Sequence, residues 1–403
     1  MQKKLIALAV AGLVSGGAFA QSNVTIQGQF KEAFENVRAT GAATSAADLT
    51  SRNRVTDHNS WLRFSGEEAL GNGTSAWFQI ESAIGTSDNV GTTGSAAPAV
   101  ASSATLGTRN TAVGLKGAWG NVLMGKWDVY YQTLAPVDGG WAGNMPLSTS
   151  SLNLTHTNGQ GNGFGGRLNN VVAYITPNMN GLSAVIGWAG SGTATNENTT
   201  AGLQGKETGW TFNPSYVNGP ISVFYAYLKA TNVGATTGTA ANASGLEATA
   251  NRLGAAYTFP FGLKIGFVWD KNKLATGDGS AIAGLAVTGG AATASLRQRT
   301  AWTIPVNFNT GANTFYFTYG KANNVQTQLG DQANTGAKMM VLAYDYALSK
   351  RTAVNVSWSS VTNDPNAKYD FWHPSSNVGA QSATGLPAGA DPRAVIFGIR
   401  HQF

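Results

Sequence analysis

The chain has 403 residues, of which 11% are charged, 10% are aromatic and 51 are glycine, and it contains no cysteine. Low charge with many aromatic side chains argues against disorder, and the lack of cysteine excludes disulfide scaffolds, thiol catalysis and cysteine-ligated metal centres. The formal net charge is +6, but the lysines and arginines are scattered and form no basic run, so we expect no nucleic-acid partner.

Residues 1–20 have the three parts of a secretory signal peptide. These parts are a positive start, an apolar run and a small-x-small cleavage site, at Lys3-Lys4, 5–14 and Ala18-Phe19-Ala20. The apolar run is too short to span a bilayer as a helix. We therefore predict an exported mature chain of residues 21–403, which must gain its stability from backbone pairing and burial because it has no disulfides.

The mature chain shows hydrophobic alternation with a period of two residues. Along 302–308, for example, Trp302, Ile304, Val306 and Phe308 alternate with Thr303, Pro305 and Asn307. Similar alternation occurs at 221–227, 263–270 and 352–358. This pattern predicts strands with one apolar and one polar face. No apolar run of 18 residues follows the predicted cleavage site, so we predict no transmembrane helix.

Three features favour an outer-membrane barrel over a soluble sandwich. Glycine and small polar residues occupy the polar faces, where a soluble surface would carry lysine and glutamate. Aromatic residues lie toward the ends of the apolar faces, as Trp302 and Phe308 do. Eight tilted residues give roughly 20 Å of height, which approaches the apolar band of about 25 Å in such barrels. The third feature is the spacing of the connections.

Short and long connections alternate along the chain. The short ones are predicted at 70–73, 117–120, 177–181, 218–220, 259–262, 309–312 and 348–350. The long ones are predicted near 37–57, 85–106, 129–166, 190–205, 231–248, 274–295, 324–335 and 363–392. Seven turns and eight loops predict an all-β, sixteen-stranded antiparallel transmembrane barrel. Closure leaves no unpaired sheet edge in lipid, and this many strands enclose a water-filled interior.

Several segments, taken in order, resemble the Gram-negative general porins, especially those of the β-proteobacterial type. These segments are 22–28, 61–71, 78–82, 113–117, 123–126, 166–170, 344–352 and 397–403. The resemblance covers nearly the whole chain and implies a homotrimer in the outer membrane. It also implies passive diffusion of small hydrophilic solutes and contact with outer-membrane lipid and lipopolysaccharide. By the same resemblance, the terminal Phe403 is part of the signal that the barrel-assembly machinery reads.

The longest connection, 129–166, is expected to narrow the barrel. A structureless loop of this length is unusual unless it is functional, and the third loop of porins folds into the lumen. By resemblance, Asp138 is the candidate for the acidic side of the constriction; the alternative is that it caps a turn.

The opposite wall of the constriction is expected to be basic. By resemblance Lys126 and Arg167 belong to it, at the end of the fifth strand and the start of the sixth. Arg63 is a further candidate, although the family usually carries arginine two places earlier, where this chain has Trp61. Lys31 lies on the polar face of the first strand and should also point inward. For each of these the alternative is a solvated lumen charge without a special role.

More basic than acidic groups at the constriction predict a weak preference for anions, with filtering by pore charge and by size. The rival function from another class is an outer-membrane enzyme, but the four histidines, His58, His156, His373 and His401, form no convincing catalytic pair. We expect neither catalysis nor a cofactor or metal. The stronger alternative is a substrate-specific channel for a sugar or organic anion, with Trp127, Tyr130, Tyr131 and Trp141 as a binding slide; their other interpretation is loop packing.

Overall fold

The computed structural model describes residues 23–85, 87, 106–128, 134–139, 146–155, 167–190, 208–231, 246–276, 294–372, 377–379 and 385–403. The predicted signal peptide lies outside the described residues. Within them, no helix is long and apolar enough to cross a membrane.

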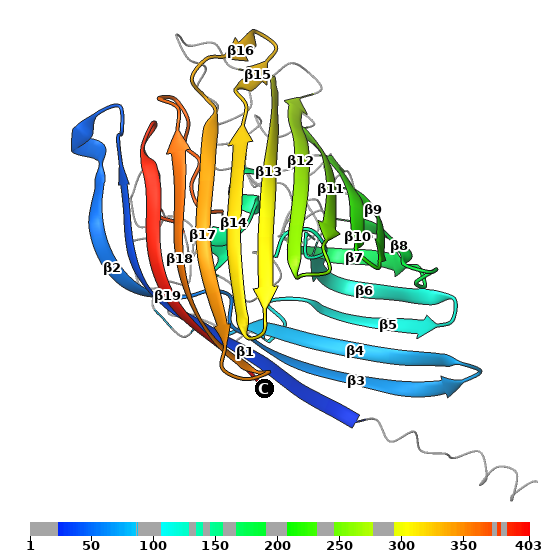
Figure 1. The fold of residues 1–403 in the computed structure, drawn as a ribbon. Helices are drawn as coiled ribbons and strands as arrows, with labels where there is room; N and C mark the ends of the chain where they lie inside the picture. The colour runs from blue at the N-terminus through cyan, green and yellow to red at the C-terminus, as the bar shows by residue number, and fades with distance from the viewer. Residues whose placement is uncertain are drawn as a thin grey trace, which may run out of the picture.

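In the described part of the chain, nineteen strands form one antiparallel sheet that curves around an interior (Figure 1). The strands are β1 (Asn23–Thr40), β2 (Leu49–Asp57), β3 (Trp61–Gly71), β4 (Thr74–Ala83), β5 (Thr111–Gly117), β6 (Gly120–Asp128), β7 (Arg167–Ile175), β8 (Leu182–Ala189), β9 (Thr208–Asn218), β10 (Ile221–Thr231), β11 (Leu246–Thr258), β12 (Leu263–Thr276), β13 (Leu296–Thr310), β14 (Asn313–Ala322), β15 (Val325–Thr327), β16 (Gly330–Gln332), β17 (Ala337–Ala347), β18 (Thr352–Asn363) and β19 (Asp391–Gln402). The short helical segments are η1 (Ser45–Ala47), η3 (Leu147–Thr149) and α2 (Leu152–Thr155).

The sheet closes into a barrel of sixteen strands. β1 pairs with β19 from Gln29 to Thr40, which joins the two ends of the sheet. β2 and β3 are two halves of one barrel strand, because β1 pairs with both of them in succession. β15 and β16 form a small hairpin in the connection between β14 and β17, which pair directly with each other. The predicted all-β, sixteen-stranded fold is therefore confirmed.

The seven predicted short turns join neighbouring strands at one end of the barrel. In the first of them Gly71 pairs with Thr74, so Asn72 and Gly73 are the two central residues. Their φ angles are 51° and 72°. A two-residue hairpin turn of this kind requires positive φ at both positions, which Asn-Gly adopts with little strain. The strand ends that the long connections join lie at the opposite end of the barrel.

The predicted first loop, 37–57, is largely wrong. β1 continues to Thr40 and β2 begins at Leu49, so the connection between them is residues 41–48. The two strands are joined by polar side chains as well as by the ladder, since Asn36 Nδ2 donates to Asn53 Oδ1 at 2.7 Å. This part of the hairpin carries few apolar residues, and hydrophobic alternation therefore could not reveal it.

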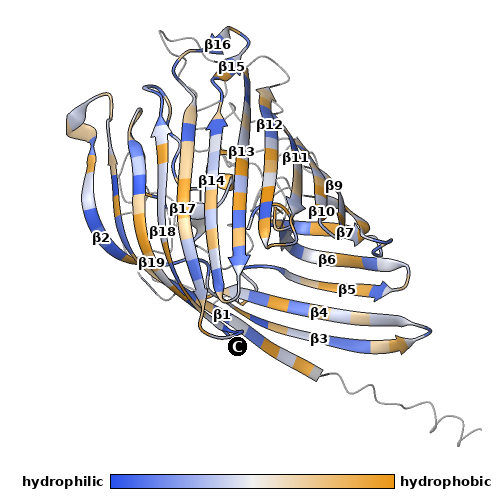
Figure 2. Cartoon of the chain, viewed as in Figure 1, coloured by the Kyte–Doolittle hydropathy of each residue, from blue (hydrophilic) through white to orange (hydrophobic). Residues whose placement is uncertain are grey.

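Most large apolar side chains of the strands point out of the barrel, and many of the inward ones are polar, so the two colours alternate along the strands in Figure 2. On β13, Thr303 and Asn307 are buried inside, whereas the intervening Trp302, Ile304 and Val306 are partly exposed outside. Large exposed residues such as Val113 (60%) and Phe397 (61%) belong to the outer face. This face has the pattern expected of strands in contact with lipid.

One local irregularity changes which residues of the second barrel strand point inward. Opposite the two residues of β1 that follow Gln29, the second strand has three residues, 58–60, with Asn59 at a φ of 82°. One extra residue shifts the alternation by one position. Arg54 on β2 and Arg63 on β3 therefore both point inward, although their offset along the chain is an odd number of positions.

Candidate functional site in the barrel interior

Loop 3, residues 129–166, lies inside the barrel in its described parts, 134–139 and 146–155 (Figure 1). Thr303 Oγ1 of β13 donates to Ser151 Oγ at 2.8 Å, and Lys264 of β12 donates through Nζ to the carbonyl of Pro136. Asn153 Nδ2 lies 3.5 Å from Met339 Sδ of β17. These contacts dock the loop on the inner wall formed by β12 to β17.

A buried cluster of Arg252, Asp270 and Arg299 anchors the end of α2; we call it the sealed cluster. Asp270 lies 3.2 Å from a guanidinium nitrogen of each arginine. Arg252 Nη2 also donates to the carbonyl of Thr155 at 2.9 Å, and Arg299 donates to that of Leu154. The last carbonyls of a helix have no partner within it, so the two arginines satisfy them. All three side chains are fully buried.

Asp138 caps a turn within loop 3. Its Oδ2 accepts from the backbone N–H of Ser151 at 2.8 Å and from the hydroxyl of Ser150 at 3.4 Å. Because the residue is fully buried, its carboxylate does not face an open lumen. The geometry is that of the alternative interpretation, in which Asp138 holds the two described parts of the loop together.

Across the barrel, Arg63, Glu81 and Arg109 form a second cluster, which we call the open cluster. Both arginines bind one carboxylate: Arg63 donates to Glu81 Oε2 through Nε at 2.9 Å, and Arg109 donates to Oε1 at 2.6 Å. The Arg63 guanidinium also lies 4.6 Å from the centre of the Trp61 ring. Glu81 is buried, but the side chains of Arg63 and Arg109 remain 30% and 14% exposed. This cluster thus presents one excess positive charge to water.

The other predicted basic residues differ in their surroundings. Arg167 is ion-paired, with Nη2 2.9 Å from Asp128 Oδ1 and Nε donating to Asn110 Oδ1 at 2.8 Å. Lys31 points inward but is only 3% exposed; Arg400 is its partner residue in the β1–β19 register.

Lys126 lies on the outer face of the barrel, which corrects its predicted place in the pore. It pairs with Thr111 in a ladder that runs without a shift through Val113 and Met124. Val113 and Met124 are 60% and 55% exposed on the outer face, and residues two positions apart on a strand share a face. The inward neighbour is Trp127, whose ring lies 6.1 Å from that of Trp77. This contact supports the packing role for Trp127; Tyr130, Tyr131 and Trp141 lie outside the described residues.

Loop 8, residues 364–390, also enters the barrel in its described parts. Its residues Tyr369, Phe371, Val378 and Leu386 pack in one buried apolar cluster with inward residues of β1, β14 and β17 to β19. Asp370 shapes the loop by accepting from the backbone N–H groups of Val378 at 3.0 Å and Gly379 at 2.7 Å. Burial raises the pKa of the Asp370 carboxyl, and these N–H groups act in the opposite direction. The loop was predicted only as a long connection.

Loop 8 is bound on two sides. Arg54 of β2 donates to the carbonyl of Asn377 at 3.1 Å. On the other side, the backbone N–H of Trp372 donates to Asn153 Oδ1 of loop 3 at 3.1 Å. Leu154 of loop 3 belongs to the same apolar cluster as Phe371. The two inserted loops therefore form one connected unit against the inner wall.

The described histidines have structural contacts. His58 is fully buried, with Nε2 2.6 Å from Glu35 Oε1 and 3.1 Å from Thr56 Oγ1. Glu35 also accepts from Arg54 at 2.7 Å. His401 Nδ1 lies 2.9 Å from Thr352 Oγ1. His156 and His373 lie outside the described residues.

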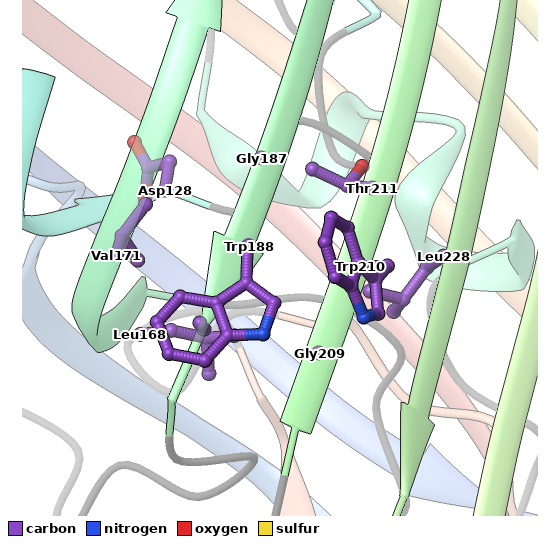
Figure 3. A pocket seen from close by; sticks show the side chains of 10 residues that line it. Asp128, Leu168, Val171, Gly187, Trp188, Gly209, Trp210, Thr211 and Leu228 are labelled. Atoms are coloured by element: carbon purple, nitrogen blue, oxygen red, sulfur yellow. The ribbon is translucent and has the colours of Figure 1, made fainter. Parts of the chain in front are cut away.

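A small apolar cavity of about 20 Å³ lies between β7, β8, β9 and β10 (Figure 3). Leu168, Val171 and Leu228 line it, and the side chain of Asp128 lies at one end. This volume holds about one water molecule, so the cavity is too small for a sugar.

The C-terminal Phe403 closes the barrel seam at the end that carries the short turns. Its backbone N–H and carbonyl pair with Gly28 at 3.1 and 3.0 Å, and its ring stacks on Phe30 at 5.9 Å. A Cβ at position 28 would lie 2.2 Å from the Phe403 ring. A larger residue at this position would displace the Phe403 ring.

The closed antiparallel sheet, its apolar outer face and its charged interior with inserted loops define an outer-membrane β-barrel of the channel-forming class. The protein family described as Gram-negative porin matches residues 7–366. The chain belongs to this family, and its location is the outer membrane.

Several relatives are similar over different lengths. Outer membrane porin protein 32 of Delftia acidovorans is 28% identical over 432 residues, which cover 100% of both chains. A protein of Halomonas sp. named monosaccharide porin is 26% identical over 213 residues, covering 50% of this chain and 53% of the relative. The match thus spans about half the length of that relative.

Two solved structures show the same fold. The anion-selective porin from Comamonas acidovorans has a TM-score of 0.66 at 21% identity, with 95% of this chain and 100% of that chain covered. A loop L8 deletion mutant of OmpT from Vibrio cholerae has a TM-score of 0.60 at 11% identity, with 95% and 99% covered.

Proposed function

We propose that this porin is a general diffusion channel, through which small hydrophilic solutes and ions pass passively with a weak preference for anions. The observation that carries the proposal is the open cluster, where Arg63 and Arg109 share the single carboxylate of Glu81 and keep part of their surface in water. The similarity to the Comamonas acidovorans structure, described as an anion-selective porin, also supports a preference for anions.

The proposed mechanism is electrostatic filtering combined with exclusion by size. At physiological salt the Debye length is about 8 Å, so charges on the wall of a narrow passage act at its centre, while charges at the mouth are screened. The excess positive charge of the open cluster raises the local concentration of anions. The arginine side chains stay fixed because their carboxylate partner is buried.

The test is the reversal potential of single channels in a salt gradient. Wild-type protein should show anion preference, and the double variant Arg63→Gln/Arg109→Gln should lose most of it. The matched control is Lys116→Gln, which removes a cation of the exposed Lys116–Glu67 pair, 2.6 Å apart, near a short turn. A cation preference in the wild type, or unchanged selectivity in the double variant, would refute the proposal.

The alternative proposal is a substrate-specific channel, and the similarity to a monosaccharide porin over part of the chain favours it. A panel of sugars and organic anions distinguishes the two functions. One solute that blocks the ion current in a saturable way would support the specific channel. Conductance that falls smoothly with solute size, with no saturation, supports general diffusion.

We also propose a homotrimer, removal of residues 1–20, and recognition of Phe403 by the barrel-assembly machinery. The OmpT structure described as a trimer form supports the first of these. Cross-linking of the protein in outer membranes should give trimers, and a product no larger than a monomer would refute this proposal.

N-terminal sequencing of the exported protein should begin at Gln21; a start elsewhere would refute that cleavage site. Phe403→Ala should slow membrane assembly in cells, and an unchanged assembly rate would refute the proposed role in recognition.

A further inference from the structure

A pocket of about 650 Å³ lies on the wall formed by β1, β3, β4 and β5, at the end of the barrel that carries the short turns; we call it the vestibule pocket. Two of its lining residues are Ser65, two positions from Arg63 on β3, and Gln79, two positions from Glu81 on β4. Residues two positions apart on a strand share a face. The pocket therefore faces the lumen, directly beside the open cluster on the side of the short turns.

Trp77 forms the aromatic surface of the vestibule pocket. Its Nε1 donates to Asn121 Oδ1 on β6 at 2.8 Å, and its ring packs against the ring of Trp127 at 6.1 Å. A Cβ at Gly114 would lie 2.6 Å from the Trp77 ring, so the ring occupies space that this glycine leaves free on β5. The ring is thus fixed against the wall, and it remains partly exposed.

Polar groups surround the Trp77 ring. Thr25, Ser65 and Gln79 form one row across β1, β3 and β4, because Ser65 pairs with each of the other two. Gln79 Nε2 donates to the carbonyl of Asn110 at 2.9 Å, which orients the amide and leaves its oxygen as an acceptor. The two hydroxyls of the row can donate and accept. The pocket thus combines an aromatic surface with several neutral hydrogen-bonding groups.

The charges at the edge of the vestibule pocket cancel each other. Glu67 and Lys116 are its charged lining residues, and their side chains form an ion pair with Nζ 2.6 Å from Oε2. The other lining residues are uncharged. The open cluster beside the pocket carries an excess positive charge, so an anion would favour that cluster. The pocket itself suits an uncharged ligand.

We propose that the vestibule pocket binds an uncharged pyranose sugar, a proposal that rests on the diffusion of hydrophilic solutes through this lumen. One face of a pyranose ring carries mainly C–H groups, which can pack on the Trp77 ring, while its hydroxyls bond to the polar row. The volume lies in the range of about 300–1,000 Å³ that is typical of small-molecule sites. The short turns are periplasmic in such barrels, so the sugar is held where it leaves the channel.

The test is saturation-transfer-difference NMR of methyl β-D-glucopyranoside with the folded, full-length mature barrel in nanodiscs. Trp77→Leu should weaken binding at least about fivefold, because the aromatic surface is lost. Trp77→Phe should stay within about threefold of the wild type, because an aromatic ring remains. The matched control is Trp210→Leu, which removes a tryptophan that is 52% exposed on the outer face. It should bind as the wild type does.

A second variant tests the polar row without changing the packing of Trp77. Thr25→Ala/Ser65→Ala removes two hydroxyls and should weaken binding at least about threefold. Sorbitol, an acyclic polyol without a ring face, should give no transfer above that of Trp77→Leu with the glucoside, and glucuronate should bind no more tightly than the glucoside.

Binding of the glucoside by Trp77→Leu or by the double alanine variant as strong as by the wild type would overturn the proposal. So would equal binding of sorbitol, or tighter binding of glucuronate. The lining strands are neighbours on one wall, so the sugar lies beside the passage and should not block the ion current. Trp77→Leu should keep the wild-type reversal potential, since no charge changes. Failure of this site is thereby distinguished from failure of the general channel, which the reversal potential tests.

Discussion

The sealed cluster and the open cluster use the same chemistry in two different ways. Each places two arginines around one carboxylate on the inner wall. In the sealed cluster the remaining donors of Arg252 and Arg299 meet the carbonyls of loop 3, and no side chain is exposed. In the open cluster part of the surface of Arg63 stays in contact with water. The position of the inserted loop therefore decides whether an arginine pair anchors the chain or supplies an electric field to the passage.

The largest effect is expected from removing the shared carboxylate of each cluster. Asp270→Asn leaves two buried guanidinium groups without their counter-charge, and breaking such a buried network costs about 3–5 kcal/mol. Glu81→Gln should cost much less, because water solvates Arg63 and Arg109. Thermal unfolding of the purified barrels in detergent, followed by the loss of β-sheet circular dichroism, measures both variants.

The two variants should also differ in their effect on ion selectivity. Glu81→Gln should increase anion selectivity, because one negative charge leaves the exposed wall. Asp270→Asn should leave selectivity near the wild-type value in those barrels that fold. Equal destabilisation by the two variants would show that the clusters do not differ as their burial implies.

An intermediate effect is expected from two single variants, each of which removes one arginine from one of the two clusters. Arg299→Met loses its bonds to Leu154 and Asp270, so loop 3 should leave the wall more often. Single-channel records should then show larger and noisier conductance, with little change in reversal potential. Arg63→Met should do the opposite, with a lower anion preference and a quiet current. A quiet current from Arg299→Met would contradict the anchoring role.

The fold could be predicted from the sequence because both of its signals are local. Alternation with a period of two residues predicts the outer and inner faces, and the short connections between such stretches predict the turns. The prediction of the first connection was wrong where β1 and β2 become polar on both faces, because alternation is lost there. Loop 8 could not be predicted to enter the barrel, because its contacts with Arg54 and Asn153 join segments more than 200 residues apart.

The site was predictable only in part, for the same reason. Glu81 and Arg109 are 28 residues apart, and no local pattern indicates that they share Arg63. Lys126 was assigned by resemblance, although its spacing of two from Met124 already indicates the outer face. The extra residue at 58–60 shifts the alternation between Arg54 and Arg63, and that shift depends on the partner strand.

The smallest effect is expected from Arg63→Lys, which separates charge from geometry in the open cluster. A lysine keeps the positive charge, but it cannot donate through a planar fork to Glu81 or stack on Trp61. Loss of the ring contact, 4.6 Å in the wild type, should reduce stability by about 0.5–1 kcal/mol. The reversal potential should stay near the wild-type value because the net charge of the wall is unchanged. If the lysine variant loses as much selectivity as Arg63→Gln, then the placement of the guanidinium, rather than its charge, selects the ion.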